Sequence, residues 1–137
     1  MPPEAARIAT TREWFEKVAI DLRGAEIDLS AKPPLPEDAL FHCQQAVEKA
    51  LKGFLTWHDR PFRKTHDLRE LRERCTAIDS SLEGCLAPIT GLTDYAWLLR
   101  YPGEIVTPTP EEGDSALALA REVVASILAR LPAEVRP

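Results

Sequence analysis

The stretch LFHCQQAVEKALK, residues 40–52, continued by GFLTWHDR to Arg60, decides the fold of this chain. At about 100° per residue, its apolar side chains recur on one side of a helix. That stripe consists of Leu40, Cys43, Val47, Leu51, Phe54 and Leu55, with Gln45, Lys49, Gly53 and Thr56 opposite and His42 on the outer face. We therefore expect a long amphipathic helix that packs one face against a core.

Two polar side chains interrupt the stripe, Gln44 and, near the end of the helix, His58. Gln44 lies between Leu40 and Val47, and a buried amide needs hydrogen-bond partners. We expect Gln44 to reach a neighbouring helix, either as a structural residue of a bundle core or as part of a functional site.

Four further segments have helical periodicity or helix-terminus signals. The predicted helices run from an N-cap at Thr10 to about Leu29, from Pro36 to Arg60, from His66-Asp67-Leu68 through Ile78, from Asp79-Ser80-Ser81 to Arg100, and from about Glu111 to Pro132. Pro88 either kinks the fourth helix or marks its true start. No segment shows sustained strand alternation. We predict an all-α, up-and-down bundle of four main helices plus one shorter helix, in a single domain 1–137 whose bundle spans about 10–132.

Composition limits the classes of function. The chain has a net charge of -5, so it is not expected to coat nucleic acid by bulk electrostatics. A basic run between Arg60 and Arg74 is either a solvated helix face and loop or a local basic patch. The absence of a long apolar run or a signal sequence predicts a cytoplasmic protein without membrane contact, with its three cysteines reduced.

Two isoleucines, Ile20 and Ile27, lie seven residues apart on the polar side of the first predicted helix. They are either a partner surface or ordinary exposed apolar residues. Replacing both with glutamate would distinguish the two interpretations.

Three motifs in order resemble the HEPN domain family: Gln44 to Lys52 (QQAVEKALK), His66-Asp67-Leu68, and Arg100-Tyr101-Pro102-Gly103. The similarity covers about residues 14–131. It implies a helical bundle, commonly a homodimer, often encoded beside a minimal nucleotidyltransferase in toxin-antitoxin-like pairs. Many members are metal-independent ribonucleases with an arginine followed four to six residues later by a histidine, whereas others bind nucleotides or are non-catalytic partners.

The chain departs from the nuclease pattern after Arg100, where no histidine follows in that window. Arg60 and His66 have the required five residues between them, but Pro61 and a helix junction separate them. If the bundle closes as in the family, Arg100, Tyr101, His66 and Asp67 come within reach of Lys52. Arg100 and Lys52 would then hold a phosphate, His66 would move a proton, and Asp67 would orient its imidazole.

The same residues also have purely structural interpretations. His66 or Asp67 is a helix cap, Arg100 pairs with Asp67 or Glu48, and Glu48 pairs with Lys52 at i,i+4. No glycine-rich phosphate loop, nucleophile elbow or zinc-ligand spacing is present, so we expect no cofactor and no metal. Three hypotheses follow: a dimeric, nucleotide-associated module that works with a nucleotidyltransferase, a ribonuclease toxin, and a non-catalytic scaffold.

Overall fold

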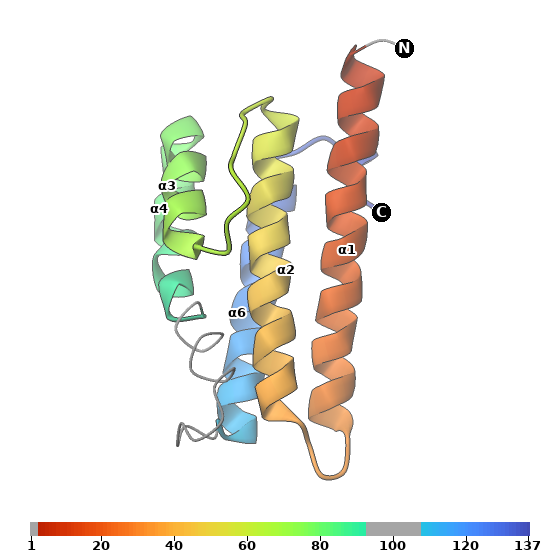
Figure 1. Ribbon diagram of the computed structural model, residues 1–137, viewed down its shortest axis with the longest axis vertical. Helices are drawn as coiled ribbons and strands as arrows, with labels where there is room; N and C mark the ends of the chain where they lie inside the picture. The colour runs from red at the N-terminus through yellow and green to blue at the C-terminus, as the bar shows by residue number, and fades with distance from the viewer. Residues whose placement is uncertain (1–2, 93–107) are drawn as a thin grey trace.

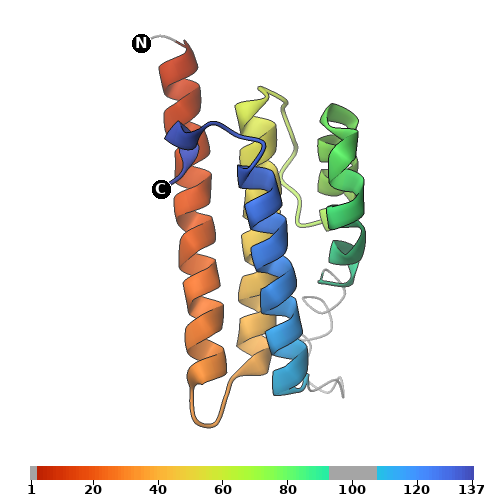
Figure 2. The same cartoon turned by 180° about the vertical axis from the view of Figure 1, so that it is seen from behind.

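The predicted central helix, α2 (Pro36–Trp57), occupies the middle of an all-α bundle. The computed structural model describes residues 3–92 and 108–137, and it contains no strand within them. Helix α1 (Pro3–Ser30) lies antiparallel to α2 on one side, while α3 (Leu68–Ile78) and α4 (Glu83–Leu86) lie on the other (Figure 1). Helix α6 (Pro110–Leu128) packs along a third side of α2 (Figure 2). The predicted helical bundle is therefore confirmed.

Helix α2 is buried on more than its predicted stripe because neighbours cover three of its sides. Every residue of that stripe is buried, as predicted. Gly53, predicted to lie on the polar face, is buried against Phe15 of α1. The prediction that His42 lies on the outer face is also wrong, because its ring packs against α1 and hydrogen-bonds Asp21 there. Periodicity identifies an apolar face but does not reveal that a second helix covers the polar one.

The start of α1 also differs from its prediction. The helix begins at Pro3, so Thr10 is an internal residue and not its N-cap. Glu4 in the first turn favours the helix dipole, and the Arg7 guanidinium lies 4.2 Å from the Trp57 ring centre. The C-terminal turn Ala133–Val135 packs against α1 as well. These tertiary contacts extend the helix beyond its local capping signal.

The remaining helix starts follow the sequence signals closely, but α2 ends at Trp57 and α6 at Leu128, before the predicted ends at Arg60 and Pro132. Pro36 lies in the first turn of α2, and Asp67 is the N-cap of α3. Asp79 caps the turn Ser80–Leu82, and a further turn, Ala87–Ile89, contains Pro88. The predicted fourth helix is therefore interrupted rather than continuous, and its part beyond Leu92 lies outside the described residues. Helix α6 begins with a full capping box between Thr109 and Glu112.

The core joins α1, α2, α3 and α6, and its largest fully buried side chains include Phe15, Phe54, Leu51, Leu71 and Ile127. The three cysteines are free thiols, and burial raises the pKa of Cys43 and Cys75 to about 12. Ile20 and Ile27 are 70% and 58% exposed, as their positions predicted. None of the helices in the described ranges is long and apolar enough to cross a membrane.

Candidate functional site

A buried carboxylate, Glu48 on α2, is the centre of the candidate site. Its residue is 2% exposed. One carboxylate oxygen, Oε1, accepts hydrogen bonds from His66 Nδ1 at 2.9 Å and from Gln44 Nε2 at 3.1 Å. The other, Oε2, accepts from Lys52 Nζ at 3.1 Å. Both oxygens of a carboxylate that folding removes from water are therefore satisfied.

Gln44 differs from its prediction in the location of its partners. Its amide nitrogen donates to Glu48 on the same helix, and its amide oxygen accepts from Gln45 Nε2 at 2.8 Å. A residue and its i+4 neighbour face the same side of a helix, so the short reach within α2 satisfies the amide. The prediction that Gln44 reaches a neighbouring helix is wrong.

Lys52 is also buried, with 8% of its residue exposed. Its ammonium lies 5.9 Å from the ring centres of both Trp14 and Phe62. These rings limit the access of water, so the ammonium depends on Glu48 for charge compensation. The i,i+4 pairing of Glu48 with Lys52, one of the structural interpretations above, is confirmed.

His66 lies on the connector between α2 and α3, and its side chain is 74% exposed. A carboxylate without a proton can only accept, so the contact with Glu48 places the imidazole proton on Nδ1. The second ring nitrogen, Nε2, is then left with its lone pair. A histidine that a buried carboxylate holds in one tautomer and orientation is suited to accept a proton at that atom.

Asp67 has a different task in the structure. Its side chain accepts a hydrogen bond from the backbone N–H of Arg69 at 3.0 Å and so caps α3, while its own N–H donates to Thr65 Oγ1. The carboxylate that hydrogen-bonds the His66 imidazole is that of Glu48, in the role that the sequence suggested for Asp67. The structure thus brings Lys52 and His66 together through Glu48, and it places Asp67 beside them as a cap.

Arg100 and Tyr101, the other predicted site residues, lie outside the described residues. Glu48 is the site residue that sequence reasoning placed only as a salt-bridge partner. Its signal was present, because Gln44, Glu48 and Lys52 follow one another at i,i+4 spacing along a helix that is otherwise apolar on that side. A line of polar residues on a buried helix predicts a hydrogen-bonded network.

The basic run near His66 divides into paired and unpaired side chains. Arg63 pairs with Glu70 at 2.9 Å and Arg72 with Glu83, and the Arg74 guanidinium donates to the backbone oxygen of Pro61 at 3.0 Å. Three other exposed side chains make no hydrogen bond or ion pair with any residue of the described ranges: Arg60, Lys64 and Arg69. Two of them, Lys64 and Arg69, lie two and three residues from His66 in the sequence.

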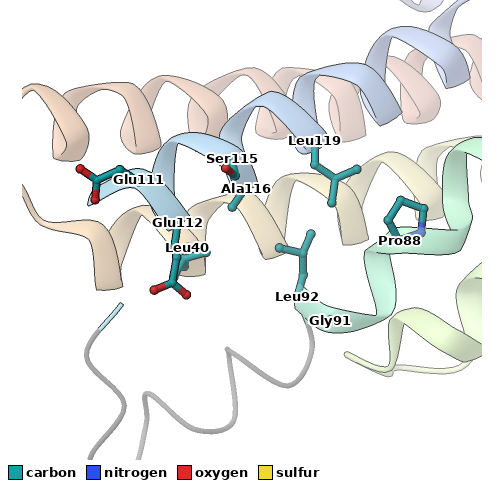
Figure 3. Close-up of a pocket in the computed structure, with 9 residues that line it drawn as sticks. All are labelled: Leu40, Pro88, Gly91, Leu92, Glu111, Glu112, Ser115, Ala116 and Leu119. Atoms are coloured by element: carbon teal, nitrogen blue, oxygen red, sulfur yellow. The ribbon is translucent and has the colours of Figure 1, made fainter. Parts of the chain in front are cut away.

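A hollow of about 350 Å³ lies elsewhere, between the first turns of α2 and α6 and residues 88–92 (Figure 3). Leu40, Leu92 and Leu119 give it apolar walls, and Glu111 and Glu112 lie near one end. Its lining includes none of Lys52, His66 and Asp67. The hollow is therefore separate from the residues that surround Glu48.

The model of the family described as HEPN domain matches residues 11–131 of the chain. No curated protein and no solved structure matches the chain. The matched range contains α2, the connector with His66, α3, α6 and the part of α1 from residue 11 onward.

Proposed function

Because the chain belongs to the HEPN domain family, we propose that it is a nucleotide- or RNA-associated module whose ligand binds at the exposed side of His66. The observation that carries this proposal is the hydrogen bond from His66 Nδ1 to buried Glu48, in a network that also holds the Lys52 ammonium. The network orients an exposed imidazole from beneath. A histidine that only capped a helix or filled the core would not need an exposed ring held by a buried carboxylate.

Electrostatics support an anionic ligand. Lys64 and Arg69 lie close to His66 in the sequence and are exposed, and the side chain of neither has a hydrogen-bond or ion-pair partner among residues 3–92 and 108–137. Cations of this kind bind phosphates and make affinity fall as salt increases. We further propose that Arg100 and Tyr101 complete the phosphate contacts. Lys52 would contribute through its charge under the site rather than by direct contact, since Trp14 and Phe62 lie beside it.

A second candidate function, RNA cleavage, is favoured by the same hydrogen bond. With the proton on Nδ1, His66 Nε2 can accept the proton of a ribose 2′-hydroxyl. The 2′-oxygen then attacks phosphorus and the bond to the 5′-oxygen breaks. The products are a 2′,3′-cyclic phosphate and a 5′-hydroxyl that takes its proton from water. An arginine beside the phosphate, Arg100 or Arg60, would stabilise the charge that develops on the equatorial oxygens.

The test is a binding and cleavage assay on mixed cellular RNA in the presence of EDTA, with wild-type protein and His66→Ala. We expect His66→Ala to weaken RNA binding, and any cleavage to fall by about 10² to 10⁴, the usual contribution of a positioned base. The fold should persist, since the side chain is 74% exposed and Gln44 still donates to Glu48 Oε1, with a loss of about 1 to 3 kcal/mol for the missing hydrogen bond to a buried carboxylate.

The matched control is His58→Gln, which also removes an imidazole. The His58 ring lies against Phe54, with their centres 4.5 Å apart, and is not part of the Glu48 network. This variant should bind and cleave like the wild type. Binding without cleavage would leave the nucleotide-associated module as the function. If the wild type neither binds nor cleaves RNA or nucleotides, the chain is a non-catalytic scaffold and the proposal is wrong.

The proposed module is a homodimer that contacts its copy through the outer face of α1. Ile20 and Ile27 are among the most exposed large apolar residues of the described ranges, and they lie on one line of that helix. We expect Ile20→Glu with Ile27→Glu to halve the mass measured by light scattering. Leu35→Glu, at another exposed apolar residue, is the control and should leave the mass unchanged. An unchanged mass in the double variant would remove this face from consideration.

The proposal also includes a nucleotidyltransferase partner in a toxin-antitoxin-like pair, which rests on the family alone. A nucleotidyltransferase gene beside this one, and co-purification of the two proteins, would support the pair. Growth arrest upon expression of this chain alone would favour the ribonuclease toxin. If the Ile20→Glu, Ile27→Glu variant is monomeric yet still binds the nucleotidyltransferase, then binding of that partner does not depend on the homodimer.

A further inference from the structure

A second polar cluster lies between the end of α1 and the start of α2, away from His66. It consists of Asp28 on α1 and of Asp38 and His42 on α2, whose nearest nitrogen and oxygen atoms all lie within 4.8 Å of one another. His42 Nε2 is 3.4 Å from Asp38 Oδ2 and 4.0 Å from Asp28 Oδ2. One imidazole nitrogen and two carboxylates thus converge on a single point.

Asp28 is the unusual member of this cluster. Its residue is 9% exposed, and its Oδ2 atom is buried without a hydrogen-bond partner among the described residues. A buried carboxylate oxygen without a donor is costly unless it binds a proton or a cation.

His42 is oriented as metal-binding histidines are. Its Nδ1 lies 3.0 Å from Asp21 Oδ1, whose other oxygen accepts from Lys49 Nζ at 2.6 Å. A proton on Nδ1 leaves the lone pair of Nε2 directed at the two other carboxylates. Gly24 makes room for the ring, because a Cβ atom there would lie 3.1 Å from it.

The charges point to a divalent cation. Three carboxylates, those of Asp21, Asp28 and Asp38, face one ammonium, that of Lys49, so a neutral His42 leaves an excess of two negative charges. Ligand atoms about 2.0 to 2.2 Å from zinc in a tetrahedron lie about 3.3 to 3.6 Å apart. The observed 3.4 Å between His42 Nε2 and Asp38 Oδ2 fits this geometry. Asp28 Oδ2 lies 4.0 Å from His42 Nε2 and would move closer when the ion binds.

We propose that Asp28, Asp38 and His42 bind a divalent transition-metal ion of the zinc class, with Asp21 holding His42 from behind. An imidazole ligand favours zinc, cobalt or nickel over magnesium and calcium. Water would complete the coordination. The ion links α1 to α2 across the connector 31–35, so its role is to stabilise this helical hairpin. His42 precedes Lys52 by ten residues, about 15 Å along α2, and the metal site is therefore independent of the proposed RNA site.

The experiment is a titration of the chelator-treated full chain with Zn²⁺ by calorimetry, and with Co²⁺ by visible absorption. We expect one ion per chain, Co²⁺ bands of a low-coordinate site, and a higher Tm with Zn²⁺ than with Mg²⁺. Asp28→Asn and His42→Gln should each abolish binding. Asp21→Asn should weaken it by about tenfold or more, as an outer partner does.

Glu37→Gln is the matched control, since Glu37 adjoins Asp38 in the first turn of α2 but is not a member of the cluster. His66→Ala tests whether Zn²⁺ binds at the exposed His66 imidazole instead. Both variants should bind Zn²⁺ as the wild type does. If His42→Gln does not fold, Asp38→Asn replaces it, because that side chain is 56% exposed. No binding by the wild type, or undiminished binding by Asp28→Asn, would overturn the proposal.

Discussion

Glu48→Ala is expected to lower the free energy of unfolding by about 3 to 5 kcal/mol, the usual cost of removing one partner of a buried ion pair. Glu48 and Lys52 are 2% and 8% exposed. Without Glu48, the Lys52 ammonium stays next to Trp14 and Phe62 with no compensating charge. Gln44 and His66 also lose their acceptor. Urea unfolding followed by circular dichroism measures the loss.

Two further variants show whether the unpaired charge causes this loss. Glu48→Leu combined with Lys52→Met replaces the pair with apolar side chains of similar length, and it should recover most of the stability. Glu48→Gln keeps an acceptor but removes the charge, so its loss should be smaller than that of Glu48→Ala. A loss below about 1 kcal/mol in Glu48→Ala would mean that Lys52 reaches water and that the pair is unimportant for stability.

Gly53→Ala is expected to destabilise the protein by about 1 to 3 kcal/mol, the range for overpacking a core. A Cβ atom at this position would lie 2.7 Å from Phe15 Cε2 and 3.2 Å from Trp14 Cβ. The Phe15 ring is 1% exposed and cannot retreat. Alanine favours a helix by about 1 kcal/mol over glycine, so an observed loss understates the clash. Thermal unfolding measures the net change.

Two other helical glycines serve as controls. A Cβ at Gly84 would meet nothing within 4 Å, so Gly84→Ala should stabilise the protein by up to about 1 kcal/mol. A Cβ at Gly113 would meet Leu29 Cδ2, the end of a flexible side chain, at 2.7 Å. Gly113→Ala should therefore cost less than Gly53→Ala. If Gly53→Ala and Gly84→Ala changed the free energy of unfolding equally, α1 could move away from α2 at Gly53 without a loss of stability.

Much of the fold could be predicted because local rules act within one helix. The apolar stripe of α2, the cap at Asp67 and the exposure of Ile20 and Ile27 follow from periodicity and capping alone. The start of α1 could not be predicted in this way. Its first turns are held by Trp57 and by the C-terminal turn, which are distant in the sequence.

The candidate site was predicted in part for the same reason. His66 and Lys52 were identified by their resemblance to a family motif, and Lys52 with Glu48 by i,i+4 spacing. That Glu48 also holds the imidazole depends on the path of the connector between α2 and α3. No spacing rule describes such a path, because a loop has no fixed period.

The sequence by itself determined the helical class of this protein, the central helix and the types of residue available for chemistry. Only the tertiary structure decided which polar residues meet: His66 with Glu48, and His42 with Asp21 and Asp38. Helix periodicity is a property of the backbone and repeats every 3.6 residues. Contacts between helices depend on which faces pack together, and burial then converts a polar side chain into one that must find a partner.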